Sequence, residues 1–219
     1  MTLPRGRMTD AIAGVTFLAF LLAAIAGPTL TGVDVAIFGG FIPARVHAFA
    51  AHNVVLHVNW LPVWLTPLSA TLIHGGWMHV ALNLIIFLYC GRFVEHLLGG
   101  GRLLILYVIG AYASAFAQWL AAPASPEPMI GASGAISAVI GTYALIFSQR
   151  EVKPIGPIPA SVVRILWMAA GWTILQLMIA LAGLSGGLLG GIAIWAHIGG
   201  FVAGLVLARP LLLWRFKAR

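Results

Sequence analysis

The stretch GASGAISAVIG, residues 131–141, follows a proline-rich loop and opens an apolar segment that runs to Ser148. A serine at a helix start is commonly an N-cap, because its hydroxyl accepts a hydrogen bond from a backbone N–H of the first turn. Here Gly131 and Gly134 flank Ser133, and glycine lets other backbone approach closely. Polar residues in apolar spans are costly unless they are used. The stretch therefore predicts a membrane helix with a functional serine at its start.

The composition of the 219-residue chain is typical of a helical membrane protein. Hydrophobic residues make up 61% and charged residues 8%, too few to cover the surface of a soluble domain. The apolar runs are long and do not alternate with period two, which predicts helices rather than a barrel. We expect one membrane domain over residues 1–219. The net charge of +7 does not indicate nucleic-acid binding, because the basic residues stand at the ends of apolar runs.

The apolar runs predict an all-α bundle of six transmembrane helices. Most of them have roughly the 17–25 residues that a span needs. The expected spans are Ala11–Gly27, Trp77–Leu98, Leu103–Ala122, Ser133–Ser148, Val162–Leu184 and Leu188–Ala208. The connection Pro28–Gly76 is long and rich in Trp and Phe, so we expect much of it to lie in the interfacial layer.

Lysine and arginine predict the orientation. With both termini in the cytoplasm, eleven of the twelve basic residues fall on or near that side, and only Arg45 falls outside. The eleven are Arg5, Arg7, Arg92, Arg102, Arg150, Lys153, Arg164, Arg209, Arg215, Lys217 and Arg219. The sequence thus predicts a multi-pass protein of a cell (inner) membrane, with a basic C-terminal tail at the lipid surface.

Two other spans carry polar residues. His79 and Asn83 are four residues apart and share one helix face, and His74 precedes them in a glycine-rich entry. His197 lies on the last predicted span, which also carries Gly200 and Gly204.

Rows of small residues predict which spans touch. Gly200 and Gly204 share a face with His197, and Gly134 and Gly141 give the serine helix a matching row. Such rows allow close helix packing in membranes. We therefore expect these two helices to meet at the serine and the histidine.

The polar residues stand at similar depths. Counted from the cytoplasmic helix ends at ~1.5 Å per residue, Ser133 stands roughly 25 Å up and His197 roughly 18 Å. Asn83 stands roughly 22 Å up and His79 roughly 28 Å. All four fall in the outer half of a core about 30 Å thick. One outward-facing site built from three helices is therefore expected.

Their chemistry predicts a serine protease inside the bilayer. Ser133 needs a base to take its proton, and the imidazole of His197 suits that role. His79, Asn83 and the Ser133 N–H can stabilise the oxyanion. The five carboxylates lie near span ends or in loops, so the expected arrangement is a dyad without an acid. These carboxylates are Asp10, Asp34, Glu95, Glu127 and Glu151.

These residues resemble the rhomboid intramembrane serine proteases, bacterial type with a six-span core. The resemblance rests on His74-x4-His79-x3-Asn83, Gly131-Ala132-Ser133-Gly134 and Ala196-His197-x2-Gly200-x3-Gly204, with Trp64-Leu65-Thr66 and Gly91-x3-Glu95-x3-Gly99 as lesser matches. It covers roughly residues 37–204. Two features depart from the pattern: Ser137 stands where some members carry an aromatic residue, and the first outer loop has no Trp-Arg pair.

The resemblance implies cleavage of single-pass transmembrane proteins near the outer face, after small residues, without a cofactor or metal. It implies Ser133 as nucleophile, His197 as base, and His79 with Asn83 at the oxyanion. His74, Gly131, Gly134, Gly200 and Gly204 are expected to support the site. The fifth span and the loop after it would gate and cap substrate entry.

Three alternatives stay open. A zinc site of His74, His79 and His197 would lack the His-Glu-x-x-His pair and a nearby carboxylate. A transporter would line a path with the polar residues but would show no need for Ser133. A catalytically silent relative would bind membrane helices without cutting them.

Overall fold

The computed structural model describes residues 3–26, 32–50, 61–147, 152–186 and 193–217, and these ranges contain helices and no β-strand. The elements in chain order are α1 (Arg7–Ala26), α2 (Gly32–Gly39), α3 (Pro43–Ala50), the 3₁₀ turn η2 (Val63–Leu65), α4 (Thr66–Ser69), the 3₁₀ turn η3 (Ala70–Leu72), α5 (Trp77–Leu98), α6 (Gly100–Ala121), α7 (Ser133–Phe147), α8 (Ala160–Gly186) and α9 (Ile194–Lys217). The predicted all-α class is confirmed.

Four of the described helices, α1, α5, α6 and α9, are long and apolar enough to cross a membrane. α7 has 15 residues, and the apolar part of α8 found among the described residues, Ala160–Ile174, is also shorter than those four. Large apolar side chains face outward, such as Ile25, which is 74% exposed, and Met78, which is 73% exposed. A surface of this kind suits hydrocarbon rather than water. The chain is therefore a multi-pass membrane protein.

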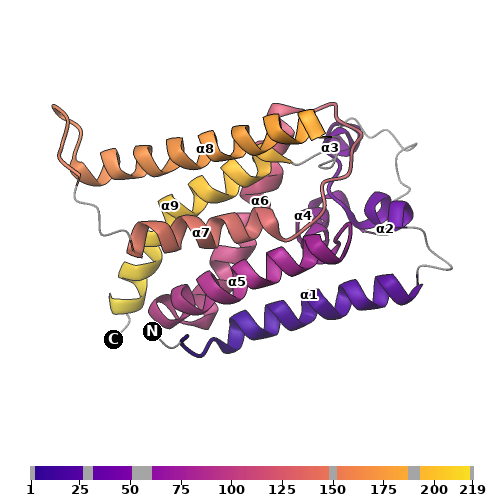
Figure 1. Cartoon of the computed structure of the whole chain (residues 1–219), viewed down its shortest axis with the longest axis horizontal. Coiled ribbons are helices and arrows are strands. Elements are labelled where there is room, and N and C mark those ends of the chain that lie inside the picture. Colours follow the sequence, from indigo (N-terminus) through magenta and orange to yellow (C-terminus); the bar gives the residue numbers. More distant parts are fainter. Residues whose placement is uncertain (1–2, 27–31, 51–60, 148–151, 187–192, 218–219) are drawn as a thin grey trace.

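The helices form one packed bundle (Figure 1). In that view α8, α9, α7, α5 and α1 follow one another from top to bottom, and α6 packs against both α7 and α9. The start of α1 and the end of α9 lie at one end of the bundle, and α2, α3 and α4 lie at the other (Figure 1). A site at the start of α7 is thus at the end where α2, α3 and α4 gather.

α7 is enclosed by other helices, and its sequence is apolar on all sides. Every residue from Gly134 to Val139 is buried. A helix without a polar face needs neighbours on each side, and α5, α6 and α9 supply them here.

α7 and α9 touch through backbone, as the glycine rows predict. A Cβ on Gly200 would collide with the carbonyl oxygen of Gly134, and one on Gly204 would collide with that of Ala138. The hydroxyl of Thr142 donates to the carbonyl of Gly204 at 2.9 Å. Only glycine permits so close an approach, so these contacts set the distance between the two helices.

The predicted spans agree well with the helices except for the last. Residues 188–192 of the predicted Leu188–Ala208 lie outside the described residues, and α9 continues past the predicted end of the span, through Pro210 to Lys217. Proline in a helix removes one hydrogen bond. Packing offsets that loss: Leu211 is 5% exposed, and the Arg102 guanidinium lies 4.8 Å from the centre of the Trp214 ring.

Short helices connect α1 to α5, where the sequence predicts an interfacial segment; residues 51–60 lie outside the described ranges. Phe41 pairs with Met129 in an isolated bridge, and the Ser69 hydroxyl donates to the carbonyl of Gly39 at 2.6 Å. The Tyr112 hydroxyl of α6 donates to the carbonyl of Trp64 at 2.9 Å. This connection therefore braces the loop that leads into α7.

Candidate active site

Ser133 is the first residue of α7, and its position is fixed by the loop before it. The N–H of Gly131 donates to the carbonyl of Ala70 at 2.8 Å, and the N–H of Ala132 donates to Nε2 of His74 at 3.3 Å. Two N–H groups at the helix entrance are thus committed to other partners. The N–H of Ser133 follows them in the first turn, where a helix offers it no acceptor of its own.

Ser133 and His197 form a hydrogen-bonded pair. The Ser133 Oγ lies 2.8 Å from Nε2 of His197, although the residues are 64 positions apart. Both residues are half-buried. This distance is that of a well-formed hydrogen bond and lies within the reach that a nucleophile and its base require.

His79 faces the same space as the serine hydroxyl. A Cβ built on Gly131 would lie 2.6 Å from His79 Nε2 and 3.7 Å from Ser133 Oγ, so one small volume over Gly131 borders both groups. Gly131 also has φ +108°, a backbone conformation that favours glycine. Glycine is therefore required at this position for its conformation and for the open space.

A contact with the backbone favours one tautomer of His79. The N–H of Gly75 donates to His79 Nδ1 at 3.4 Å. A neutral imidazole that accepts at one nitrogen carries its proton on the other. His79 Nε2 is therefore a donor, and it is the nitrogen that borders the space over Gly131.

Asn83 is buried one turn after His79 in α5, and its side-chain amide bonds to the helix backbone. Its Nδ2 donates to the carbonyl of His79, one turn earlier in α5, at 2.9 Å. The amide carries two N–H donors, so one remains. Of the two residues predicted to bind the oxyanion, the structure brings His79 to the serine and ties Asn83 to the helix backbone.

His74 contacts both the loop that leads into α7 and the ring of His79. It accepts from Ala132 N–H, and its ring packs edge-on against His79 with centroids 4.9 Å apart. Burial, and next the neighbouring His79, lower the pKa of His74 to about 4. The ring is therefore neutral at neutral pH, as its role as an acceptor requires.

The remaining supporting glycines act through packing. Gly134 contacts Ser114, and Gly200 lies between Ser114 and the carbonyl of Gly134. Gly204 makes the further contact to Ala138 described above. All three hold α9 against α7 and do not face the serine hydroxyl with a polar group.

Two aromatic residues near His197 are absent from the sequence-based site. Nε1 of Trp172, from α8, donates to the carbonyl of His197 at 3.3 Å, and its ring stacks on Phe201 at 4.8 Å and 8°. Phe201 lies one turn after His197, so helical spacing would have indicated it. No sequence pattern singles out Trp172. Ser137, by contrast, donates to the carbonyl of Ser133 at 2.8 Å and is buried.

The acidic residues with described contacts lie elsewhere. Asp10 pairs with Arg92 at 2.8 Å. The Glu95 carboxylate accepts from the N–H groups of Met8 and Thr9 at 3.0 and 2.8 Å, and so caps the start of α1. Within the described part of the chain, no three His, Cys, Asp or Glu side chains are grouped as metal ligands.

Comparison with known proteins identifies the family. The model of the rhomboid domain matches residues 54–214, which is most of the chain. The chain belongs to the rhomboid family. The predicted resemblance is confirmed, and all the candidate site residues named above lie within the matched rhomboid domain.

Several curated relatives carry rhomboid names. The rhomboid protease GlpG of Pectobacterium atrosepticum is 29% identical over 84% of this chain and 62% of its own length. That of Serratia proteamaculans is 31% identical over 68% of this chain and 49% of its own. The chloroplastic rhomboid-like protein 11 of Arabidopsis thaliana is 28% identical over 71% of this chain and 55% of its own length. The chain thus spans about half to three fifths of the length of these relatives.

Proposed function

We propose that this rhomboid-family protein is an intramembrane serine endopeptidase that hydrolyses peptide bonds of single-pass transmembrane proteins. The observation that carries the proposal is the 2.8 Å hydrogen bond between Ser133 Oγ and His197 Nε2 at the start of a buried helix. The rhomboid proteases among its relatives support the same activity.

The first step is attack by Ser133. His197 Nε2 takes the hydroxyl proton while Oγ bonds to the carbonyl carbon of the scissile peptide. The carbonyl oxygen gains the negative charge. His197 then gives the proton to the leaving nitrogen, and the C–N bond breaks to leave an acyl-enzyme.

The oxyanion is stabilised by donors already in place. His79 Nε2–H borders the space over Gly131, and Ser133 N–H is in the first turn of α7. The positive end of the helix dipole adds to both. Asn83 contributes through its second amide N–H when the substrate displaces solvent. His74 positions His79 and the α7 entrance and does not touch the substrate.

Hydrolysis of the acyl-enzyme completes the cycle. Water reaches the half-buried Ser133 from the end of the bundle that carries α2, α3 and α4. His197 removes a proton from the water while the water oxygen bonds to the acyl carbon. The bond between the acyl carbon and Ser133 Oγ then breaks, Oγ takes the proton from His197, and the peptide leaves with a new carboxyl end. The basic residues predict that this end is the outer face, with both termini in the cytoplasm of a bacterial-type inner membrane.

Cleavage of a model transmembrane substrate in liposomes tests the proposal. Wild type, Ser133→Ala and His197→Ala are compared, each with and without chelator. Ser161→Ala and His96→Ala are matched controls, since both residues are exposed and distant from the site. We expect activity only in wild type and controls, unaffected by the chelator. Cleavage that persists in Ser133→Ala would refute the mechanism.

The catalytically silent alternative has its own test. If wild type fails to cleave, reaction with a fluorophosphonate decides between a poor choice of substrate and an inert serine. Labelling of Ser133 that depends on His197 supports the protease. A serine that does not react in the folded protein supports a helix-binding relative.

A further inference from the structure

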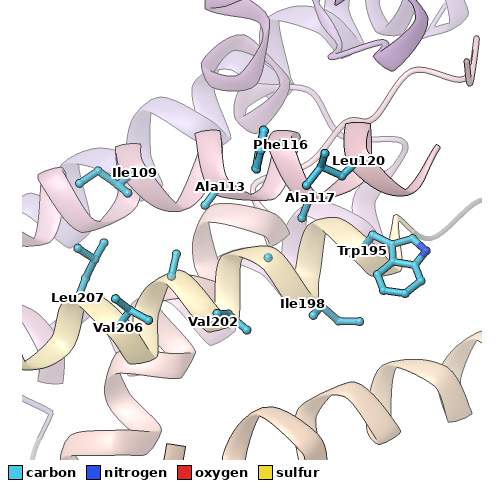
Figure 2. Close-up of a pocket in the computed structure, with 12 residues that line it drawn as sticks. Ile109, Ala113, Phe116, Ala117, Leu120, Trp195, Ile198, Val202, Val206 and Leu207 are labelled. Carbon is cyan, nitrogen blue, oxygen red and sulfur yellow. The ribbon is translucent and has the colours of Figure 1, made fainter. Parts of the chain in front are cut away.

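An apolar groove runs along the outside of the α6–α9 pair. Its volume is about 470 Å³, and Figure 2 shows its walls, which include Phe116 of α6 and Trp195, Ile198 and Val206 of α9. All of its lining residues have apolar side chains or are glycine. No charged or hydrogen-bonding ligand is therefore suited to its floor.

The groove exists because small residues bring the two helices together. A Cβ on Gly199 would collide with the Cβ of Ala117 and would lie 2.8 Å from the carbonyl oxygen of Ala113. The axes are thus close at this level. No large side chain fills the wedge outside the contact, while Phe116 and Val206 stand 57% and 59% exposed at its edges.

The dimensions of the groove decide what can occupy it. Its α9 wall extends from Trp195 to Leu207, which is roughly 18 Å at 1.5 Å per residue. A volume of 470 Å³ over that length gives a mean cross-section of roughly 26 Å². A helix with its side chains is about 10–12 Å wide, so it could not enter this groove whole and would meet it only along one face. A single hydrocarbon chain fits.

We propose that this groove binds one acyl chain of a membrane phospholipid. Both walls belong to helices long enough to span the membrane, so the groove faces the lipid hydrocarbon. Trp195 stands at the end of the groove next to His197, and tryptophan prefers the interface where lipid headgroups begin. The bound acyl chain therefore belongs to a lipid of the membrane leaflet that lies nearer to Ser133 and His197, and the headgroup of this lipid lies beside Trp195.

A bound chain would hold α9 in place behind the site. Ile198 and Gly199 face the groove and α6, while the next residue, Gly200, packs on Gly134 of α7. The lipid fills the groove on one side of α9, and the contact of Gly200 with Gly134 holds the opposite side of α9 against α7. The proposal concerns binding and stands whether or not the protein cleaves peptides.

Photolabelling of the full chain in liposomes tests this site. The probe is a phosphatidylcholine with a diazirine in the middle of one acyl chain. We expect adducts to concentrate in residues 109–120 and 195–207 over other lipid-facing segments. Ala203→Leu fills the groove and should lower this labelling about tenfold, a loss of ~1.4 kcal/mol in binding. Ala24→Leu, at an exposed site on α1, should leave it unchanged.

Several results would overturn the proposal. One is labelling spread evenly over all lipid-facing helices, and another is labelling of the groove unaffected by Ala203→Leu. Protection of the groove in cross-linked dimers would assign it to a second copy, and protection by a transmembrane substrate would assign it to a helix. If Ala203→Leu does not fold, the distribution of adducts on wild type decides alone.

Discussion

Gly200→Ala is expected to uncouple Ser133 from His197 without touching either residue. The new Cβ would collide with the carbonyl oxygen of Gly134 and lie 2.7 Å from Ser114 Oγ. Since a carbon–oxygen contact needs roughly 3.3–3.6 Å, α9 has to move away from α7 by about 1 Å. The bond between Ser133 and His197 would stretch from 2.8 Å to beyond the roughly 3.6 Å at which a hydrogen bond is lost.

Gly200→Ala is expected to lower both the reaction rate of Ser133 and the free energy of unfolding. A misplacement of this size lowers the rate about 10²-fold, which is ~2.7 kcal/mol of activation free energy. Overpacking also lowers the free energy of unfolding by about 1–3 kcal/mol. The assay is the rate at which a fluorophosphonate labels Ser133, with the Tm measured on the same sample.

Gly101→Ala is the matched control, because a Cβ there would meet no atom within 4 Å. It should label Ser133 at the wild-type rate. A folded Gly200→Ala protein that also labels at the wild-type rate would show that the α7–α9 contact does not set the distance between serine and histidine. The reasoning would then be refuted.

Three further predictions follow from the contacts around the site. Gly131→Ala places a Cβ 2.6 Å from His79 Nε2 at φ +108°, so labelling of Ser133 should fall strongly, and unfolding should be easier by about 1–2 kcal/mol; wild-type labelling would contradict this. Because the pKa of His74 is about 4 in the fold and about 6.5 when unfolded, stability should decline as the pH falls from 6.5 to 4, and the Tm of His74→Asn should depend less on pH over that range. Glu95→Gln removes the charge that caps α1 and should lower the free energy of unfolding by ~2 kcal/mol, with no change in the labelling of folded protein; an unchanged Tm would show that the cap is dispensable.

The sequence predicts that Ser133 and His197 meet, because the glycines on each of their two helices recur with helical period. Gly200 and Gly204 lie on the His197 face, and such rows in membranes indicate backbone contact. The start of α5 at Trp77 and that of α7 at Ser133 also agree with prediction, since each follows a glycine-rich turn. Local pattern and tertiary packing favour the same answer at these positions.

Other features depend on partners that are distant in sequence. The contact of Trp172 with His197 requires the placement of α8, which no local pattern encodes. The passage of α9 through Pro210 depends on Leu211 and Trp214 packing against the bundle. The Asn83 amide donates to the carbonyl of His79, and periodicity places the residue on a helix face without deciding the direction of that amide.

The distribution of the site over the chain has a consequence for synthesis. Ser133 begins α7, whereas His197 lies in α9, the last of the described helices, and is held there by glycine contacts that form only when α9 packs. Domains of this kind are made from the N-terminus onward. A nascent chain that has inserted α1 to α8 therefore carries the serine without the imidazole beside it. Under the proposed mechanism, the growing polypeptide is therefore inert toward its neighbours in the membrane until α9 has packed against α7.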